Sequence, residues 1–166
     1  MEKSKVKSQK SKIGFTLIEL LVVISIIGIL AALLLARFGT AEKSGRDAQR
    51  KSDINQYRIA LENSAVNTNG VYPSRTTGAG DRASTLLCGD LGTSYLADCP
   101  EDPRYSASSW DYYRYQSNGS GGGAVDATQY VLWAKKETGL DYWVACSDGK
   151  IGELSSVSVS SGNCPL

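Results

Sequence analysis

Glu19 is the residue whose surroundings most restrict the chemistry it can perform. It begins a long apolar run, and the 17 positions from Leu20 to Ala36 carry no charge. With residues 15–19 the run reaches about the 20 residues that cross a bilayer. An ionised carboxylate inside a membrane span is unfavourable and usually marks a functional site with a partner. We therefore expect Glu19 to pair with a cation.

Gly14 and Phe15 indicate where that cation could come from. Cleavage between them would create an α-amino group four residues before Glu19, about one helical turn away. This amine could neutralise the carboxylate of its own or of a neighbouring subunit. Gly14 has no side chain, so the backbone could enter a peptidase cleft at this point.

The segment Gly14-Phe15-Thr16-Leu17-Ile18-Glu19, preceded by a lysine-rich stretch, resembles the type III signal of type IV pilins and type II secretion pseudopilins. In that family a basic leader ends in Gly, Phe usually follows, and Glu is the fifth mature residue. The resemblance implies that a prepilin peptidase of the inner membrane cuts after Gly14 and methylates the nitrogen of Phe15. It also implies a structural subunit of a homopolymeric filament, which works with an inner-membrane assembly platform and minor pilins and needs no cofactor.

Two other kinds of N-terminal segment share some of these features. A Sec signal peptide also has a basic start, but its apolar core spans only about 7 to 15 residues. An uncleaved signal anchor fits the length and would make the protein a signal-anchored extracellular binding domain that does not polymerise. Neither explains a carboxylate at position 19. Deleting residues 15–36 would distinguish a filament subunit from a signal-anchored binding domain, because a binding domain would still work without them.

Four cysteines, Cys88, Cys99, Cys146 and Cys164, all follow the apolar run. An even number of cysteines in an exported region predicts two disulfides. Four cysteines allow three pairings, and proximity in the chain favours Cys88–Cys99 and Cys146–Cys164. The loop closed by the second pair resembles the C-terminal disulfide-bounded region of many pilins. Zinc is the alternative use of these thiols, but the chain has no histidine and no Cys-x-x-Cys pair.

Residues 70–73 and 99–103 resemble the Gly-x-Tyr-Pro and Pro-x-Asp-Pro elements of major pseudopilins. Some of these proteins bind Ca²⁺ in a C-terminal loop, and hard oxygen ligands are available here in Asp126, Asp148 and Glu153. The sequence contains no twelve-residue calcium loop, however, and residues 119–123 differ from the usual site.

The composition argues against catalysis and against a dominant nucleic-acid surface. No histidine is present to act as a general base, and therefore no Cys/His nucleophile pair exists. The predicted leader contains five lysines and one glutamate, so the mature chain keeps 13 basic and 16 acidic residues and a net charge of −3. Non-specific binding to phosphates relies on an excess of Lys and Arg. Because these catalytic groups are missing, we expect a protein that is not an enzyme; a signal-anchored enzyme with a Ser–Lys dyad is the alternative.

The lysines of residues 1–14 also orient the apolar run, because positive charge is retained in the cytoplasm. This predicts a single-pass protein of the inner (cytoplasmic) membrane with a cytoplasmic N-terminus. After assembly the subunit would lie in an extracellular or periplasmic filament.

A long helix must position Glu19. No proline precedes Pro73, and the first strong stop is residues 67–70, so we predict a helix over 15–67 with residues 15–36 as membrane span and filament core. The second half is amphipathic, with an apolar stripe at helical spacing formed by Ile54, Tyr57 and Leu61. Oppositely charged pairs one turn apart are predicted on its solvent face: Glu42/Arg46, Asp47/Lys51 and Arg58/Glu62.

Residues 68–166 predict a small globular head. Aromatic and β-branched runs at 112–115, 130–134 and 142–146 predict an antiparallel sheet, to which residues 150–153 add an edge strand. The link between the second and third runs is short enough for a hairpin. Packed on the apolar stripe of the helix, this sheet gives an α+β pilin fold, with a cleaved leader over 1–14, the helix over 15–67 and the head over 68–166.

Overall fold

The computed structural model describes residues 14–106, 112–139 and 141–166, apart from the side chains of residues 36 and 37. The predicted leader lies outside the described residues except for Gly14. The chain forms two compact units, Met1–Gly39 and Thr40–Leu166, and the boundary falls inside the long helix rather than at its end. The division at residues 67 and 68 stays a prediction.

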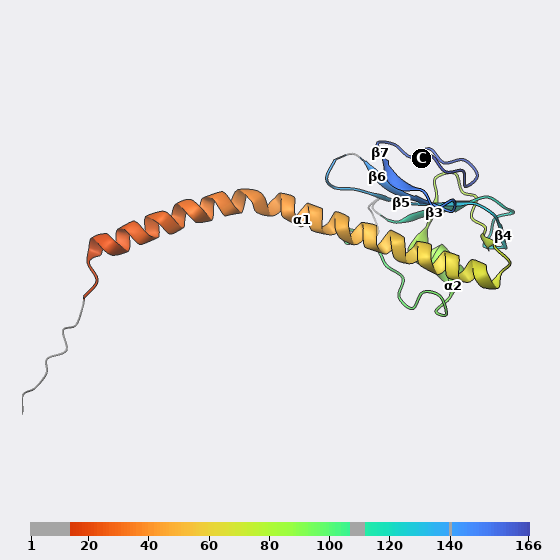
Figure 1. Cartoon of the computed structure of the whole chain (residues 1–166), viewed down its shortest axis with the longest axis horizontal. Helices are drawn as coiled ribbons and strands as arrows, with labels where there is room; N and C mark the ends of the chain where they lie inside the picture. Colours follow the sequence, from red (N-terminus) through yellow and green to blue (C-terminus); the bar gives the residue numbers. More distant parts are fainter. Residues whose placement is uncertain (1–13, 107–111, 140) are drawn as a thin grey trace, which may run out of the picture. The chain divides into compact units, whose positions relative to one another are not determined.

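Helix α1, Leu17–Asn67, confirms the predicted long helix (Figure 1). It ends where the backbone turns into the left-handed region at Asn69 (φ 56°) and Gly70 (φ 81°). The Gly70 N–H then donates to the carbonyl of Ala65 at 2.8 Å, which satisfies a terminal carbonyl of the helix.

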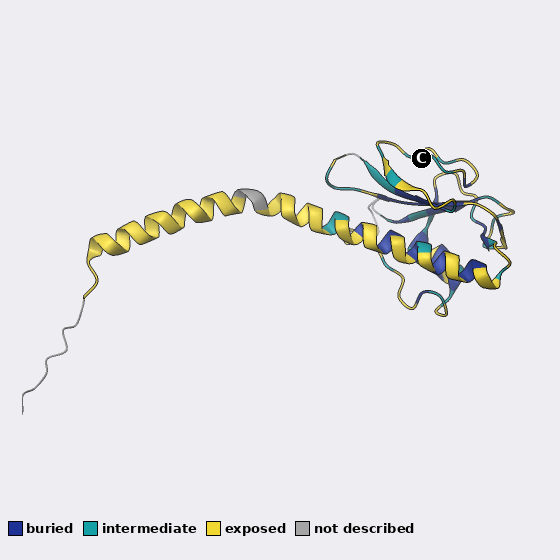
Figure 2. Cartoon of the chain, viewed as in Figure 1, coloured by how far each residue is buried: buried dark blue, intermediate teal, exposed yellow. Residues whose placement is uncertain are grey.

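The two halves of α1 are buried to different extents. Residues 14–35 are all exposed, whereas the second half presents one buried face (Figure 2). That face contains the predicted stripe, because Ile54, Tyr57 and Leu61 are fully buried in the core of the head. The apolar stripe is thus confirmed.

The head contains an antiparallel five-stranded sheet with the strand order β2-β3-β5-β6-β7. Its members are β2 (Asp81–Arg82), β3 (Arg114–Ser117), β5 (Tyr130–Lys135), β6 (Tyr142–Cys146) and β7 (Ile151–Leu154). The α+β class, the hairpin of β5 with β6 and the edge strand β7 are confirmed. Strand β3 begins two residues later than predicted.

Strand β5 is buried on both faces, which explains why its sequence is continuously apolar. Tyr130 and Leu132 face the core shared with α1, whereas Val131 and Trp133 belong to a second cluster with side chains of the C-terminal tail. A strand covered on both sides needs no polar alternation. The helix and the tail therefore cover the sheet from its two sides.

Several short elements were not predicted. Strands β1 (Tyr72–Pro73) and β4 (Val125–Ala127) form a separate two-stranded sheet. A π-helical turn, η1 (Ala83–Leu87), leads into the one-turn helix α2 (Cys88–Leu91). β1, η1 and α2 lie between the end of α1 and β3, whereas β4 lies between β3 and β5.

Candidate functional site

Thr16 and Glu19 cap the start of α1. The Thr16 backbone N–H donates to Glu19 Oε2 at 3.0 Å, and the Thr16 hydroxyl donates to the same oxygen at 2.9 Å. The Glu19 N–H donates in return to Thr16 Oγ1 at 3.2 Å. This reciprocal arrangement is a capping box, in which an N-cap hydroxyl and the acid three residues later satisfy free N–H groups of the first turn.

Thr16 is a functional residue that our interpretation of the sequence missed. The Thr-x-x-Glu spacing before an apolar run is a known signal of a helix start. We had assigned Glu19 to a partner amine alone. In the single chain the Glu19 carboxylate instead accepts hydrogen bonds from Thr16. Thr16 directly follows Phe15, so the predicted cleavage point and the predicted partner of Glu19 lie in one short segment.

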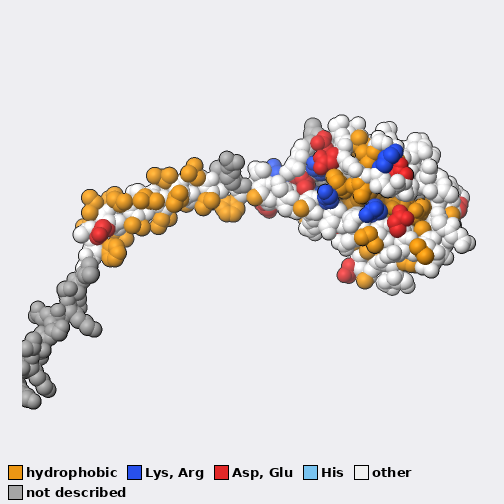
Figure 3. Space-filling view, viewed as in Figure 1, with side chains coloured by type: hydrophobic (Ala, Val, Ile, Leu, Met, Phe, Trp, Pro, Cys, Tyr) orange, Lys and Arg blue, Asp and Glu red, His pale blue; other side chains and the backbone are white. Residues whose placement is uncertain are grey.

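The surface around Glu19 is apolar. Helix α1 is the one helix in the described part of the chain that is long and apolar enough to cross a membrane. Leu17, its first residue, is 90% exposed, Phe15 just before it is 85% exposed, and apolar side chains cover the first half of the helix in the space-filling view (Figure 3). Monomeric soluble proteins rarely expose such a large apolar surface, so lipid or other protein chains must cover it.

A second polar site lies where the other half of α1 meets the head. Arg50 is buried, and its Nε and Nη2 donate to the two oxygens of Asp102 at 2.6 and 2.8 Å. Its Nη1 lies 2.8 Å from both Asp47 and Glu137. A buried guanidinium needs such compensation, since an unpaired charge in the interior is strongly unfavourable. This cluster fixes two separate loops of the head to the helix.

Two of the three acids of this cluster, Asp47 and Glu137, are held ionised. Hydrogen bonds from Arg46, followed by those from Arg50, lower the pKa of Glu137 to about 2 despite partial burial. Burial raises the pKa of Asp47, but hydrogen bonds from Thr138 and from the backbone of the 137–138 loop outweigh it and lower that pKa to about 2. Both carboxylates therefore stabilise the contact only while they are charged.

Of the three predicted pairs along the helix, only Glu42/Arg46 is confirmed, at 2.7 Å. The other two are wrong among the described residues, because tertiary contacts take their members. Asp47 binds Arg50 and Thr138, and the Lys51 amine lies 4.3 Å above the Trp143 ring.

Glu62, the last predicted partner on the helix, accepts hydrogen bonds from the hydroxyls of Tyr72 and Tyr130. Arg58 donates to Asn55. Buried tyrosine hydroxyls need acceptors, and the helix supplies one here.

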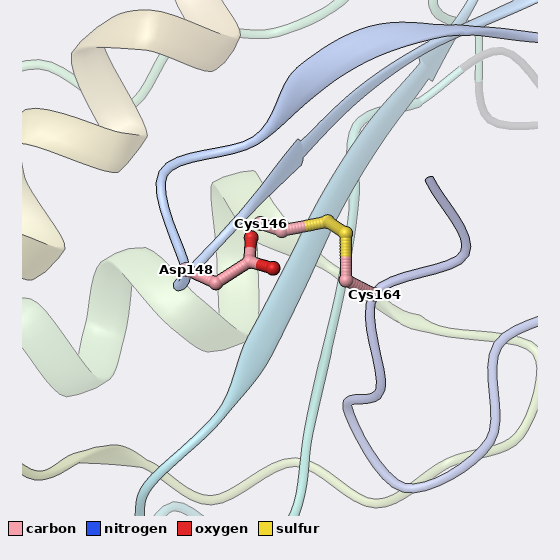
Figure 4. A group of neighbouring side chains, drawn as sticks. All are labelled: Cys146, Asp148 and Cys164. Carbon is pink, nitrogen blue, oxygen red and sulfur yellow. A yellow bond between two sulfur atoms is a disulfide. The ribbon is translucent and has the colours of Figure 1, made fainter.

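The four cysteines are joined as Cys88–Cys99 and Cys146–Cys164. The Asp148 carboxylate points toward the second disulfide (Figure 4). These are three residues of metal-binding types within reach of one another, but the two sulfurs are bonded to each other and offer no thiolate. The geometry thus does not fit a metal held by these cysteines.

The three calcium candidates are not brought together in the structure. Asp126 accepts from the Ser120 N–H, Asp148 pairs with Lys150, and Glu153 pairs with Lys136. Calcium takes six to eight oxygens around one point, so residues engaged separately do not form such a site.

Comparison with protein families identifies the N-terminal segment. Residues 9–35 match the family described as the prokaryotic N-terminal methylation motif. No curated protein compared with the chain matches it significantly. The matched range includes Gly14, Phe15, the capping box and most of the exposed apolar helix. The chain therefore carries the prepilin signal of type IV pilins and pseudopilins at the N-terminus of an α+β, pilin-like architecture.

Proposed function

We propose that the protein is a structural subunit of a type IV pilus or type II secretion-like filament. In this proposal a prepilin peptidase cleaves between Gly14 and Phe15 and methylates the new N-terminus, and Glu19 directs assembly. The observation that carries the proposal is the exposed apolar half of α1, which holds one carboxylate and lies within the methylation motif. Such a surface suits a bilayer first and copies of itself afterwards.

The capping box suggests how the carboxylate is kept before assembly. Glu19 accepts both hydrogen bonds from Thr16, so its charge is partly satisfied within its own chain. Cleavage after Gly14 would create an amine one residue before Thr16. In a filament, the Phe15 amine of one subunit would pair with Glu19 of its neighbour in a dry core, where opposite charges attract strongly. The pairing would also set the axial stagger between subunits.

The head has a structural role in this proposal. Its buried polar groups hold loops to the helix, and its disulfides close two short loops. Assembly would proceed with the inner-membrane platform and minor pilins that the prepilin signal implies. The membrane-held precursor would keep its N-terminus in the cytoplasm and place the head outside.

Replacing the carboxylate tests the proposal. Glu19→Gln keeps the size and much of the capping geometry but removes the charge, so the subunit should insert and be cleaved yet yield at least tenfold less sheared filament. Glu42→Gln is the matched control, because its exposed pair with Arg46 contributes little. Filament yield is compared with mature membrane-bound subunit by immunoblot. Wild-type filament yield from Glu19→Gln, with Phe15 as the mature N-terminus, would contradict the role of Glu19 and favour a signal-anchored domain.

A further inference from the structure

A small cavity in the head is lined almost entirely by cationic side chains. It has a volume of about 150 Å³ and lies beside the start of the β5–β6 connection. Five of its six lining residues are basic; the six are Lys43, Arg50, Arg104, Lys135, Lys136 and Glu137. The buried contacts of Arg50 account for only part of this convergence of positive charge.

Some of these charges are already compensated. Arg50 is buried against Asp102, and Glu137 is occupied by Arg46 and Arg50. Lys136 pairs with Glu153. The only acid in the lining therefore has little charge left to offer to the other cations.

Three cations remain available to a ligand. Lys43 and Lys135 are exposed and form no ion pair with any residue that the structure describes. The Arg104 side chain is 54% exposed and touches Glu137 only at 3.3 Å. Ammonium and guanidinium groups converging on a cavity of this size are suited to a phosphate group.

One lining residue, Lys43, is close in sequence to the predicted membrane span. Lys43 follows the last residue of the apolar run, Ala36, by seven positions. Even a fully extended chain could carry it no more than about 25 Å from that point, and a helix would carry it about 10 Å. The headgroup layer outside the hydrocarbon core is about 5 to 8 Å thick.

We propose that the cavity binds the phosphate of an anionic phospholipid in the leaflet from which the helix emerges. This rests on the proposed membrane-held subunit. Lys43 would donate from the helix, Lys135 from the end of β5, and Arg104 from the loop after Cys99. Lipid binding would hold the head at the surface of the bilayer until assembly removes the subunit. Near an anionic membrane each added lysine strengthens binding about fivefold.

Native mass spectrometry of the full-length mature chain from detergent micelles tests this inference. Phosphatidylglycerol and phosphatidylcholine with identical acyl chains are offered together, and retained lipids are counted. The wild type should retain phosphatidylglycerol preferentially. The double variant Lys43→Gln/Lys135→Gln should reduce that preference about tenfold or more, while its near-ultraviolet circular dichroism stays unchanged.

Arg58→Gln/Lys150→Gln is the charge-matched control. Arg58 lies fifteen positions beyond Lys43 on α1, about 22 Å along the helix, and Lys150 lies beyond the opposite end of strand β6. This variant should keep the wild-type preference. If both double variants lost the preference for phosphatidylglycerol equally, the effect would be explained by net charge alone and the proposal would be overturned.

Two further results would also overturn it. Equal retention of the two lipids by the wild type would exclude anionic-lipid selection. Displacement of phosphatidylglycerol by equimolar inorganic phosphate would assign the cavity to a free anion. Filament yield is scored separately, so that a wild-type chain with no lipid preference but normal filaments counts against this inference alone. Missing filaments with normal lipid preference count against the filament role alone.

Discussion

The two halves of α1 have the same backbone conformation but opposite relations to their surroundings. The first half exposes apolar side chains on all sides, and its single carboxylate is satisfied by a residue of the same turn. The second half buries an apolar stripe, and its charges reach across to loops nearly a hundred residues away in sequence. The helical form of the first half thus follows from local sequence, whereas the position of the second is set by tertiary contacts.

This difference separates two kinds of variant. Changes in the first half should alter processing and assembly and leave the head folded. Changes in the second half should alter the stability of the head and leave processing intact. All tyrosines and tryptophans lie at or beyond residue 57, so near-ultraviolet circular dichroism of the full chain reports on the head.

The largest effect is expected from Gly14→Val. A Cβ added at Gly14 meets no atom within 4 Å in the described chain, so the fold should tolerate it. A β-branched residue at the cleavage point should still block the peptidase, leaving the subunit as a full-length membrane precursor with an unchanged head spectrum. Intact-mass measurement decides. Gly28→Val, which also has open space around it, should be processed normally. A mature chain that begins anywhere other than Phe15 would refute the predicted cleavage.

Arg50→Leu should have the largest effect on the second half. It leaves Asp47, Asp102 and Glu137 without their shared cation, and breaking a buried pair in this way costs about 3 to 5 kcal/mol of unfolding free energy. Thermal unfolding followed by near-ultraviolet circular dichroism measures the loss, and cleavage after Gly14 should continue. Arg58→Leu removes a half-buried side chain whose hydrogen bonds go to Asn55 of the same helix, so it should change stability by only about 1 kcal/mol. Equal effects of the two substitutions would show that the buried cluster is not a special contact.

The prediction of elements from sequence succeeded where the signal was local. The apolar run, the absence of proline and the Asn-Thr-Asn-Gly stop were enough to place α1, and uninterrupted aromatic and β-branched residues placed β5 and β6. Strands such as Tyr72–Pro73 were missed because two residues show no alternation and pair only through tertiary contacts.

The buried cluster was missed for a related reason. Spacing along a helix predicts neighbours on that helix, so Asp47 was assigned to Lys51. Its actual partners include Thr138, which no local pattern connects to it. The capping box, in contrast, has a local sequence signal, because Thr16 and Glu19 stand three positions apart in the Thr-x-x-Glu spacing of that motif.

Removing the disulfide of the C-terminal tail should have an intermediate effect. Cys146→Ser/Cys164→Ser frees the tail that covers Val131 and Trp133, and losing a native disulfide from a small domain costs about 2 to 4 kcal/mol. The melting temperature of the head should fall by roughly 10 °C. Peptide mapping without reductant checks the pairing itself. A peptide joining Cys99 to Cys146 would contradict the arrangement.

The smallest effect is expected from acid. The pKa values of Asp47 and Glu137, both about 2, lie below their usual range near 4. The stability they contribute is therefore complete above about pH 5 and is lost as the pH falls from about 4 to about 2. Burial raises the pKa of Asp53, which opposes part of this loss. Melting curves at stepped pH should show a weaker acid dependence in Asp47→Asn. If the melting temperature of that variant fell with pH as steeply as that of the wild type, Asp47 would not contribute to the acid dependence.

Strand β5 has a consequence for how the head opens. It pairs with β3 on one edge and β6 on the other, and both of its faces are covered from Tyr130 to Ala134, so the amide hydrogens in the middle of the strand cannot reach water by fraying of an edge or a loop. These hydrogens exchange with solvent only when the whole head unfolds. The exchange rates of the Leu132 and Trp133 amides therefore report the free energy of global unfolding of the head. They can be measured on subunits in a bilayer as well as in a filament.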